Sequence, residues 1–249
     1  MILEANDISK EFKVEKGMFQ SDAGRTLALD RVSFSLQEFT TLGIVGESGS
    51  GKTTLAKILL GLIPADSGEV KFNDTYIKNF RKDVQIIFQN PYNSLDPKMR
   101  IKDALYEPLV IHSMCLRQGL RDKAKGLLEA VGLDETALDI YPSQFSGGQR
   151  QRICIARALA CEPKLLVLDE PISSLDLTIQ AKLLDLFLQL KKRFNLTYIF
   201  ISHNLAVIKY IADNVLVMQN GRVVEQGLTQ EFFSNPSQQY TRQLLDAAR

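Results

Sequence analysis

Residues 46 to 54 constrain the fold more than any other part of this chain. They read Gly-Glu-Ser-Gly-Ser-Gly-Lys-Thr-Thr, a complete Gly-x-x-x-x-Gly-Lys-Thr phosphate-binding loop. An apolar strand is expected before the loop, at 41–45, and a helix that starts near Lys52 after it, which is the context that the motif requires. The pattern predicts an α/β chain that binds phosphate, and the open alternative is a glycine-rich linker.

Each residue type in the loop has a physical role. The glycines let successive backbone N–H groups point inward at phosphate oxygens, Lys52 reaches the β and γ phosphates, and the Thr53 hydroxyl faces Mg²⁺. The positive end of the following helix adds to the anion site. The predicted nucleotide-binding residues here are Gly46, Glu47, Ser48, Gly49, Ser50, Gly51, Lys52, Thr53 and Thr54.

Composition limits the classes of protein to which the chain can belong. With 249 residues, 45% of them hydrophobic, it can bury the core of one large domain or of a domain with an inserted lobe. A net charge of +1 gives no electrostatic argument for a nucleic-acid or anionic-membrane partner. We expect a soluble, intracellular chain, because the start is acidic and no apolar run is long enough to span a membrane. We also expect reduced thiols, since the three cysteines contain no Cys-x-x-Cys pair.

The order of predicted elements indicates an inserted lobe within one domain. Short strands, the first at 2–8, alternate with turns in the opening third, which indicates a β-rich lobe, and residues 90–145 have proline-punctuated helical character. Helices then alternate with apolar strands, beginning with a helix at 147–160 and a strand at 165–168, as a parallel sheet covered on both faces requires. Asn220-Gly221, between two apolar stretches, predicts a β-hairpin. We therefore expect a catalytic core with its β lobe at 1–89 and 146–249, and a helical subdomain at 90–145.

A second motif, Leu-Leu-Val-Leu-Asp-Glu at 165–170, places two carboxylates after a buried strand. Asp169 is suited to hold the Mg²⁺ shell, and Glu170 is suited to orient and polarise an attacking water. An ordinary exposed loop after an apolar strand is the alternative.

A third motif, Phe-Ser-Gly-Gly-Gln at 145–149, predicts a second phosphate-binding helix start. Ser146 can cap the helix, while Gly147 and Gly148 let backbone N–H groups approach an anion. The two helix starts do not easily surround one γ-phosphate from the same side. A glycine-containing helix start with no ligand remains the alternative.

These motifs, together with Gln89, Ser174-Leu-Asp176 and His203, occur in the order and approximate spacing of the ATP-binding cassette (ABC) ATPases. Over nearly its whole length the chain resembles the nucleotide-binding subunit of an ABC transporter. The resemblance implies a P-loop NTPase fold with a RecA-like parallel-sheet core, an antiparallel β lobe and an inserted helical subdomain. It also implies ATP and Mg²⁺ as cofactors, and ATP hydrolysis in a head-to-tail dimer whose phosphate loop and signature segment hold ATP from two chains.

The resemblance assigns further roles. Phe12 matches the aromatic residue that stacks on adenine, with an ordinary core or edge-strand phenylalanine as the alternative and Phe19 as a weaker rival. Gln89 matches the glutamine that senses Mg²⁺ and the γ-phosphate, and His203 matches the switch histidine. The implied catalytic residues are Lys52, Gln89, Glu170 and His203, the implied metal ligands are Thr53, Gln89 and Asp169, and the implied nucleotide contacts outside the loop are Phe12, Ser146, Gly147, Gly148, Gln149 and Asp176.

Two segments, 88–100 and 235–245, resemble the oligopeptide/dipeptide/nickel importer branch of the family, although Gln238-Gln239 replaces the His-Pro that is common before Tyr-Thr. Peptide-importing members often continue into a cysteine-bearing extension. The chain stops at Arg249, and this favours nickel or metal-chelate import over small-peptide import.

The implied partners are a second cassette, identical or paralogous, two membrane permeases and, indirectly, an extracytoplasmic solute-binding protein, with no nucleic acid. The implied location is the cytoplasmic face of the inner or plasma membrane. An exporter cassette, a soluble ABC-type ATPase of DNA repair or translation, and a P-loop nucleotide kinase are the alternatives.

Overall fold

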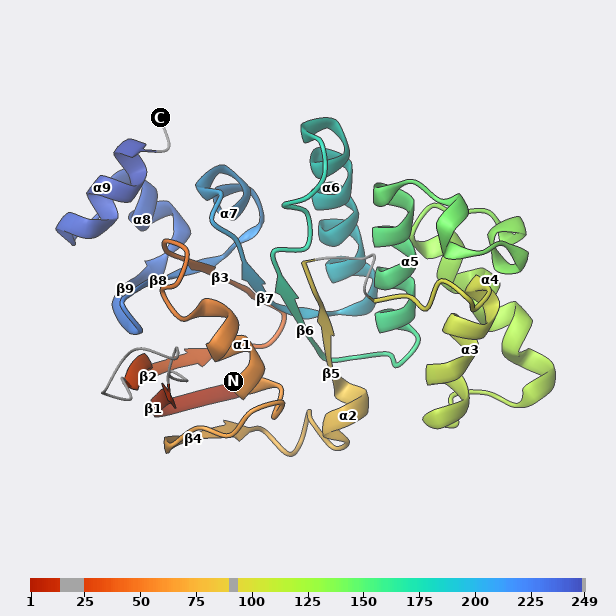
Figure 1. Cartoon of the computed structure of the whole chain (residues 1–249), viewed down its shortest axis with the longest axis horizontal. Coiled ribbons are helices and arrows are strands. Elements are labelled where there is room, and N and C mark those ends of the chain that lie inside the picture. The colour runs from red at the N-terminus through yellow and green to blue at the C-terminus, as the bar shows by residue number, and fades with distance from the viewer. Residues whose placement is uncertain (14–24, 90–93, 248–249) are drawn as a thin grey trace, which may run out of the picture. The chain divides into compact units, whose positions relative to one another are not determined.

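The computed structural model describes residues 1–13, 25–89 and 94–247 (Figure 1). They form two compact units: unit 1 comprises Met1–Tyr76 and Ile199–Arg249, and unit 2 comprises Ile77–Tyr198. The strands are β1 (Leu3–Lys13), β2 (Arg25–Leu36), β3 (Thr41–Val45), β4 (Ser67–Phe72), β5 (Val84–Ile87), β6 (Leu165–Asp169), β7 (Thr197–Ile201), β8 (Asn214–Gln219) and β9 (Arg222–Leu228). The α-helices are α1 (Lys52–Leu59), α2 (Phe80–Asp83), α3 (Ile101–Ile111), α4 (Leu120–Ala130), α5 (Gly147–Leu159), α6 (Leu177–Phe194), α7 (Leu205–Ile211), α8 (Thr229–Ser234) and α9 (Gln239–Ala247).

In unit 1, β1 is the central strand of a three-stranded antiparallel sheet in the order β2-β1-β4 (Figure 1). Leu3 faces Leu36 of β2 and Phe72 of β4. The buried residues of β1 and β2 alternate with more exposed ones, because one face of this sheet packs on the core. The predicted antiparallel β lobe is confirmed. β1 extends past the predicted end at Ile8, through a polar stretch whose sequence carries no apolar alternation.

Unit 1 also contains the strands that lead to the phosphate loop. β3 pairs in parallel with β8, and β8 pairs with β9 in an antiparallel hairpin. Asn220 and Gly221 at its turn both have positive φ, 47° and 78°, as the predicted Asn-Gly hairpin requires. α7 lies directly on β3, since a Cβ added to Gly43 would be 2.7 Å from Ile208 Cγ2.

In unit 2, β5 pairs in parallel with β6, and every residue of β6 is buried. α3, α4 and α5 pack on one another, and α5 also packs on α6. The predicted helix at 147–160 and the predicted strand at 165–168 are confirmed as α5 and β6. The described part of 90–145 contains α3, α4 and three 3₁₀ turns, at Arg117–Gly119, Glu135–Asp139 and Pro142–Gln144. Its boundaries as a subdomain stay a prediction.

Candidate functional site

The phosphate loop of unit 1 joins β3 to α1, and its shape depends on glycine. Gly46, Gly49 and Gly51 have φ of 149°, 82° and 103°. A Cβ on Gly46 would lie 2.2 Å from Met218 O, and one on Gly51 would lie 2.5 Å from Ala28 O. The loop therefore packs against backbone where no larger residue fits.

Lys52 holds the loop together from inside. The residue is only 6% exposed, and its Nζ donates hydrogen bonds to Gly46 O (2.8 Å), Glu47 O (2.7 Å) and Ser50 Oγ (3.3 Å). The loop is tied to the β8–β9 hairpin by Gly221 N, which donates to Ser50 O at 3.1 Å. An ammonium aimed at the centre of a glycine loop, at a helix N-terminus, suits a phosphate. The outer loop residues Glu47, Ser48, Gly49 and Thr53 are exposed, and Thr54 is half-buried.

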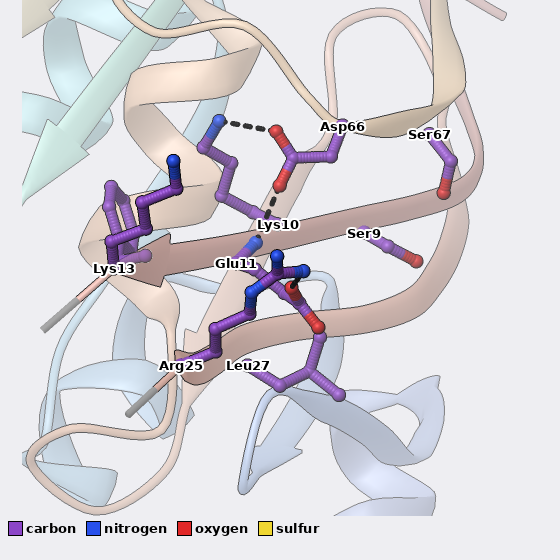
Figure 2. Close-up of a pocket in the computed structure, with 9 residues that line it drawn as sticks. Ser9, Lys10, Glu11, Lys13, Arg25, Leu27, Asp66 and Ser67 are labelled. Atoms are coloured by element: carbon purple, nitrogen blue, oxygen red, sulfur yellow. Dashed lines mark hydrogen bonds and ion pairs between the residues drawn. The ribbon is translucent and has the colours of Figure 1, made fainter. Parts of the chain in front are cut away.

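Phe12 lies near the end of β1, and its ring is 42% exposed. It lines a pocket of about 460 Å³ whose other walls include Lys10, Arg25 and Asp66 (Figure 2). Lys10 Nζ donates to Asp66 Oδ1 at 2.7 Å and lies 5.7 Å from the centroid of the Phe12 ring. An exposed aromatic ring beside a pocket fits base stacking better than it fits a core phenylalanine. Phe19 lies outside the described residues.

His203, also in unit 1, follows β7 and is exposed. Ser202 N donates to Ile44 O of β3 at 3.2 Å, and Asn204 caps α7 by accepting from Ala206 N at 2.9 Å. Because β3 runs directly into the phosphate loop, this bond places His203 at the end of the strands where the loop begins.

In unit 2, the two carboxylates predicted for metal binding and catalysis follow each other at the end of β6. Asp169 is buried, and Glu170 is half-buried with a left-handed φ of 49°. Gln89 Nε2 donates to Glu170 Oε2 at 3.1 Å, although the two residues are 81 positions apart. A strained backbone at a carboxylate is typical of functional positions, and the amide of Gln89 helps to orient the carboxylate.

The signature segment is the N-terminus of α5, closed by a capping box. Ser146 Oγ accepts from Gln149 N at 3.3 Å, and Gln149 Oε1 accepts from Ser146 N at 3.0 Å. Gly147 and Gly148 form the first turn, and both capping side chains are exposed. The helix start is therefore ordered by its own cap, and both capping side chains are accessible.

Asp176 lies beside the signature segment within unit 2. Its Oδ1 caps α6 by accepting from Ile179 N at 3.0 Å. A Cβ on Gly148 would lie 2.7 Å from Ile179 Cγ2, so the start of α6 packs against the start of α5. Unit 2 thus brings together Gln89 with Glu170 and, separately, the signature segment with the Asp176 loop.

Cys115, Cys154 and Cys161 are free thiols, and burial raises the pKa of Cys154 to about 12. A thiol that stays protonated is a poor nucleophile or metal ligand. Among residues 1–13, 25–89 and 94–247, no three His, Cys, Asp or Glu side chains lie close enough together to hold a metal ion by themselves.

Sequence reasoning missed one contact to the phosphate loop. The hydroxyl of Tyr240, on α9, accepts a hydrogen bond from Glu47 N at 3.2 Å, across 193 positions of sequence. Tyr240 lies in the 235–245 segment that the resemblance singled out, yet no local pattern connects it to the loop. Residues 90–93 of the other branch-specific segment lie outside the described residues.

Comparison with known proteins identifies the family to which the chain is similar. Residues 29–173 match the ABC transporter family. The chain is 45% identical over 254 residues to the di/tripeptide transport ATP-binding protein DppF of Pseudomonas aeruginosa, covering 99% of this chain and 78% of that protein. It is 40% identical to the glutathione import ATP-binding protein GsiA of Pectobacterium atrosepticum, covering 99% of this chain and 41% of that protein.

A solved structure shares the fold. The ATP-binding cassette MJ0796, solved as a dimer in a post-hydrolysis state bound to ADP and Pi, superposes with a TM-score of 0.77 at 25% identity, covering 92% of this chain and 99% of that chain. None of the helices in the described ranges 1–13, 25–89 and 94–247 is both long and apolar enough for a membrane span. With its phosphate loop, its Asp-Glu pair and its capped signature helix, the chain belongs to the ABC transporter family, as one of its ATP-hydrolysing cassettes.

Proposed function

We propose that this cassette powers the import of a small peptide or a similarly sized peptide-like solute through a membrane permease. The observation that carries the proposal is similarity over 99% of the chain to ATP-binding proteins named for di/tripeptide transport and glutathione import. Nickel or metal-chelate import, which the sequence favoured, is the second candidate, because the 88–100 and 235–245 segments resemble a branch that also includes nickel importers.

Within the hydrolytic step, Lys52 turns from the loop carbonyls to the β and γ phosphates, and the loop N–H groups surround them. Glu170, oriented by Gln89, polarises the attacking water, and His203 contacts the γ-phosphate. The Thr53 hydroxyl and the Asp169 carboxylate are oxygen donors, which Mg²⁺ prefers, and the ion, when bound, neutralises charge on the phosphates. Phosphate and water oxygens would supply its remaining ligands.

The second helix start requires a second cassette. Ser146 and Gln149 are exposed at the start of α5, and Leu177, next to Asp176, is 78% exposed. A helix start with exposed capping side chains and an exposed leucine beside it suits a surface that closes on another chain's ATP. The proposed dimer is head to tail, so that the signature segment of each chain completes the phosphate loop of its partner.

The permease would dock on unit 2. Val110, Ile111 and Leu116, at and just beyond the end of α3, are 52%, 68% and 75% exposed. Apolar side chains gathered at an exposed helix end are typical of a contact surface. Binding to permeases places the cassette at the cytoplasmic face of the membrane, where an extracytoplasmic solute-binding protein controls it indirectly.

The experiment is uptake by cells that carry the Glu170→Gln chain in place of the wild type. Loss of labelled dipeptide or glutathione uptake with normal nickel uptake supports the proposal. Loss of nickel uptake alone supports the second candidate. Normal uptake of all three solutes contradicts import of either class.

A further inference from the structure

The C-terminal helix α9 touches the phosphate loop through Tyr240. The tyrosine is half-buried in the first turn of α9, and its hydroxyl oxygen accepts from the backbone N–H of Glu47 at 3.2 Å. This N–H is therefore already hydrogen-bonded to a side chain from outside the 46–54 loop. The contact lies wholly within unit 1.

The bond fixes one end of a peptide group whose other end is held by the loop lysine. Lys52 Nζ donates to Gly46 O at 2.8 Å, and Gly46 O and Glu47 N belong to the same planar peptide. When Lys52 moves to a phosphate, Gly46 O loses that bond. Tyr240 can keep its bond, because that bond joins Glu47 N to the tyrosine hydroxyl and does not involve Lys52.

The start of α9 is itself anchored, so Tyr240 has a fixed position. Glu225 of β9 accepts from Ser237 N at 2.8 Å and from Gln238 N at 3.1 Å, just before the helix. Arg242 Nε donates back to Pro236 O at 3.0 Å, and the neighbouring Thr241 is fully buried. These contacts run from β9 through the 235–238 turn to the tyrosine.

We propose that Tyr240 is a positioning residue for the phosphate loop: it holds the Gly46–Glu47 peptide in the orientation that accepts nucleotide after Lys52 has turned to the phosphates. The inference rests on the nucleotide-binding role proposed for the loop. After Lys52 has moved to the phosphates, the Tyr240 bond still holds the Gly46–Glu47 peptide. Its loss should therefore weaken nucleotide binding more than it weakens folding.

The test is the affinity of the full-length Tyr240→Phe chain for Mg-ATP and for ADP by calorimetry. Loss of one hydrogen bond predicts binding weaker by about 3- to 10-fold. Maximal turnover and the melting temperature should stay near wild type. The matched control is Tyr76→Phe, which removes the hydroxyl of another half-buried tyrosine of unit 1, one that is hydrogen-bonded to Glu38 away from the loop.

A second variant removes the same bond from the donor side. Glu47→Pro has no N–H at this position, and Glu47 is not among the residues with positive φ. Adding Tyr240→Phe to Glu47→Pro should weaken binding no further, because the bond is already absent. If Glu47→Pro folds poorly, the comparison of Tyr240→Phe with Tyr76→Phe still decides the question.

The outcomes distinguish the proposed role of the loop in nucleotide binding from the proposed role of Tyr240. If the wild type binds no nucleotide, or if Lys52→Ala binds as well as the wild type, the proposed role of the loop is wrong. If the wild type binds but Tyr240→Phe stays within 1.5-fold of it, or Tyr76→Phe weakens binding equally, only the role of Tyr240 is overturned. Additive effects of Glu47→Pro and Tyr240→Phe would also overturn it.

Discussion

Replacing Glu170 with glutamine should separate ATP binding from hydrolysis. The side chains have the same shape, and the new amide oxygen can still accept from Gln89 Nε2, now 3.1 Å from Glu170 Oε2. The change removes the charge that polarises water. A lost general base is worth about 10²- to 10⁴-fold in rate, or about 3–5 kcal/mol of transition-state stabilisation. The weaker neutral hydrogen bond should lower the free energy of unfolding by only about 1 kcal/mol.

The assay compares steady-state phosphate release with ATP affinity measured by calorimetry. Glu162→Gln is the matched control, because Glu162 is in the same unit, also has a left-handed φ (51°), and pairs with Lys123 outside the site. We expect the control to hydrolyse ATP at the wild-type rate. Turnover by Glu170→Gln within about twofold of wild type would refute the assignment of Glu170, whatever the affinity.

Three further predictions concern the residues around the site. Gly148→Ala should lower the free energy of unfolding by about 1–3 kcal/mol in urea titrations, because the new methyl group meets Ile179 Cγ2 at 2.7 Å. Adding Ile179→Ala should recover part of the loss, and an unchanged urea midpoint for Gly148→Ala would contradict this packing. Asp176→Ala should lower the free energy of unfolding by about 0.5–2 kcal/mol, because it removes the cap on Ile179 N. Asp176→Asn keeps the cap and should lower it much less, so equal losses for the two variants would argue against capping. Burial acts to raise the pKa of Glu225, but hydrogen bonds to the carboxylate, including those from Ser237 N and Gln238 N, outweigh burial and lower that pKa. The stability that Glu225 contributes should therefore be present above its ordinary pKa of about 4.3 and be lost as the pH falls through the lowered value. A Glu225→Gln chain should show less of this acid-dependent loss in melting temperature, and identical pH profiles would contradict the role.

The sequence predicted the features whose causes are local. The phosphate loop, the helix cap at Ser146 and the Asn220-Gly221 hairpin each depend on a few adjacent residues, and each is present as expected. The resemblance then supplied roles for single residues such as Phe12 and His203 that no local pattern marks.

What the sequence could not predict depends on contacts between distant positions. β5 is only four residues long and contains Gln85, so it has no readable period, and it is a strand because it pairs with β6. The Gln89–Glu170 bond and the Tyr240–Glu47 bond join residues 81 and 193 positions apart. Such pairs follow from topology rather than from local propensity.

The central claim is that the signature segment of one chain completes the phosphate loop of another. The most direct measurement is disulfide crosslinking between Ser48→Cys on one tagged chain and Ser146→Cys on a second, both carrying Glu170→Gln and with the half-buried Cys115 replaced by serine. We predict a crosslink between the two chains that forms with Mg-ATP and not with ADP or without nucleotide. A crosslink that forms equally well without ATP, or the absence of a crosslink with ATP bound, would contradict this claim.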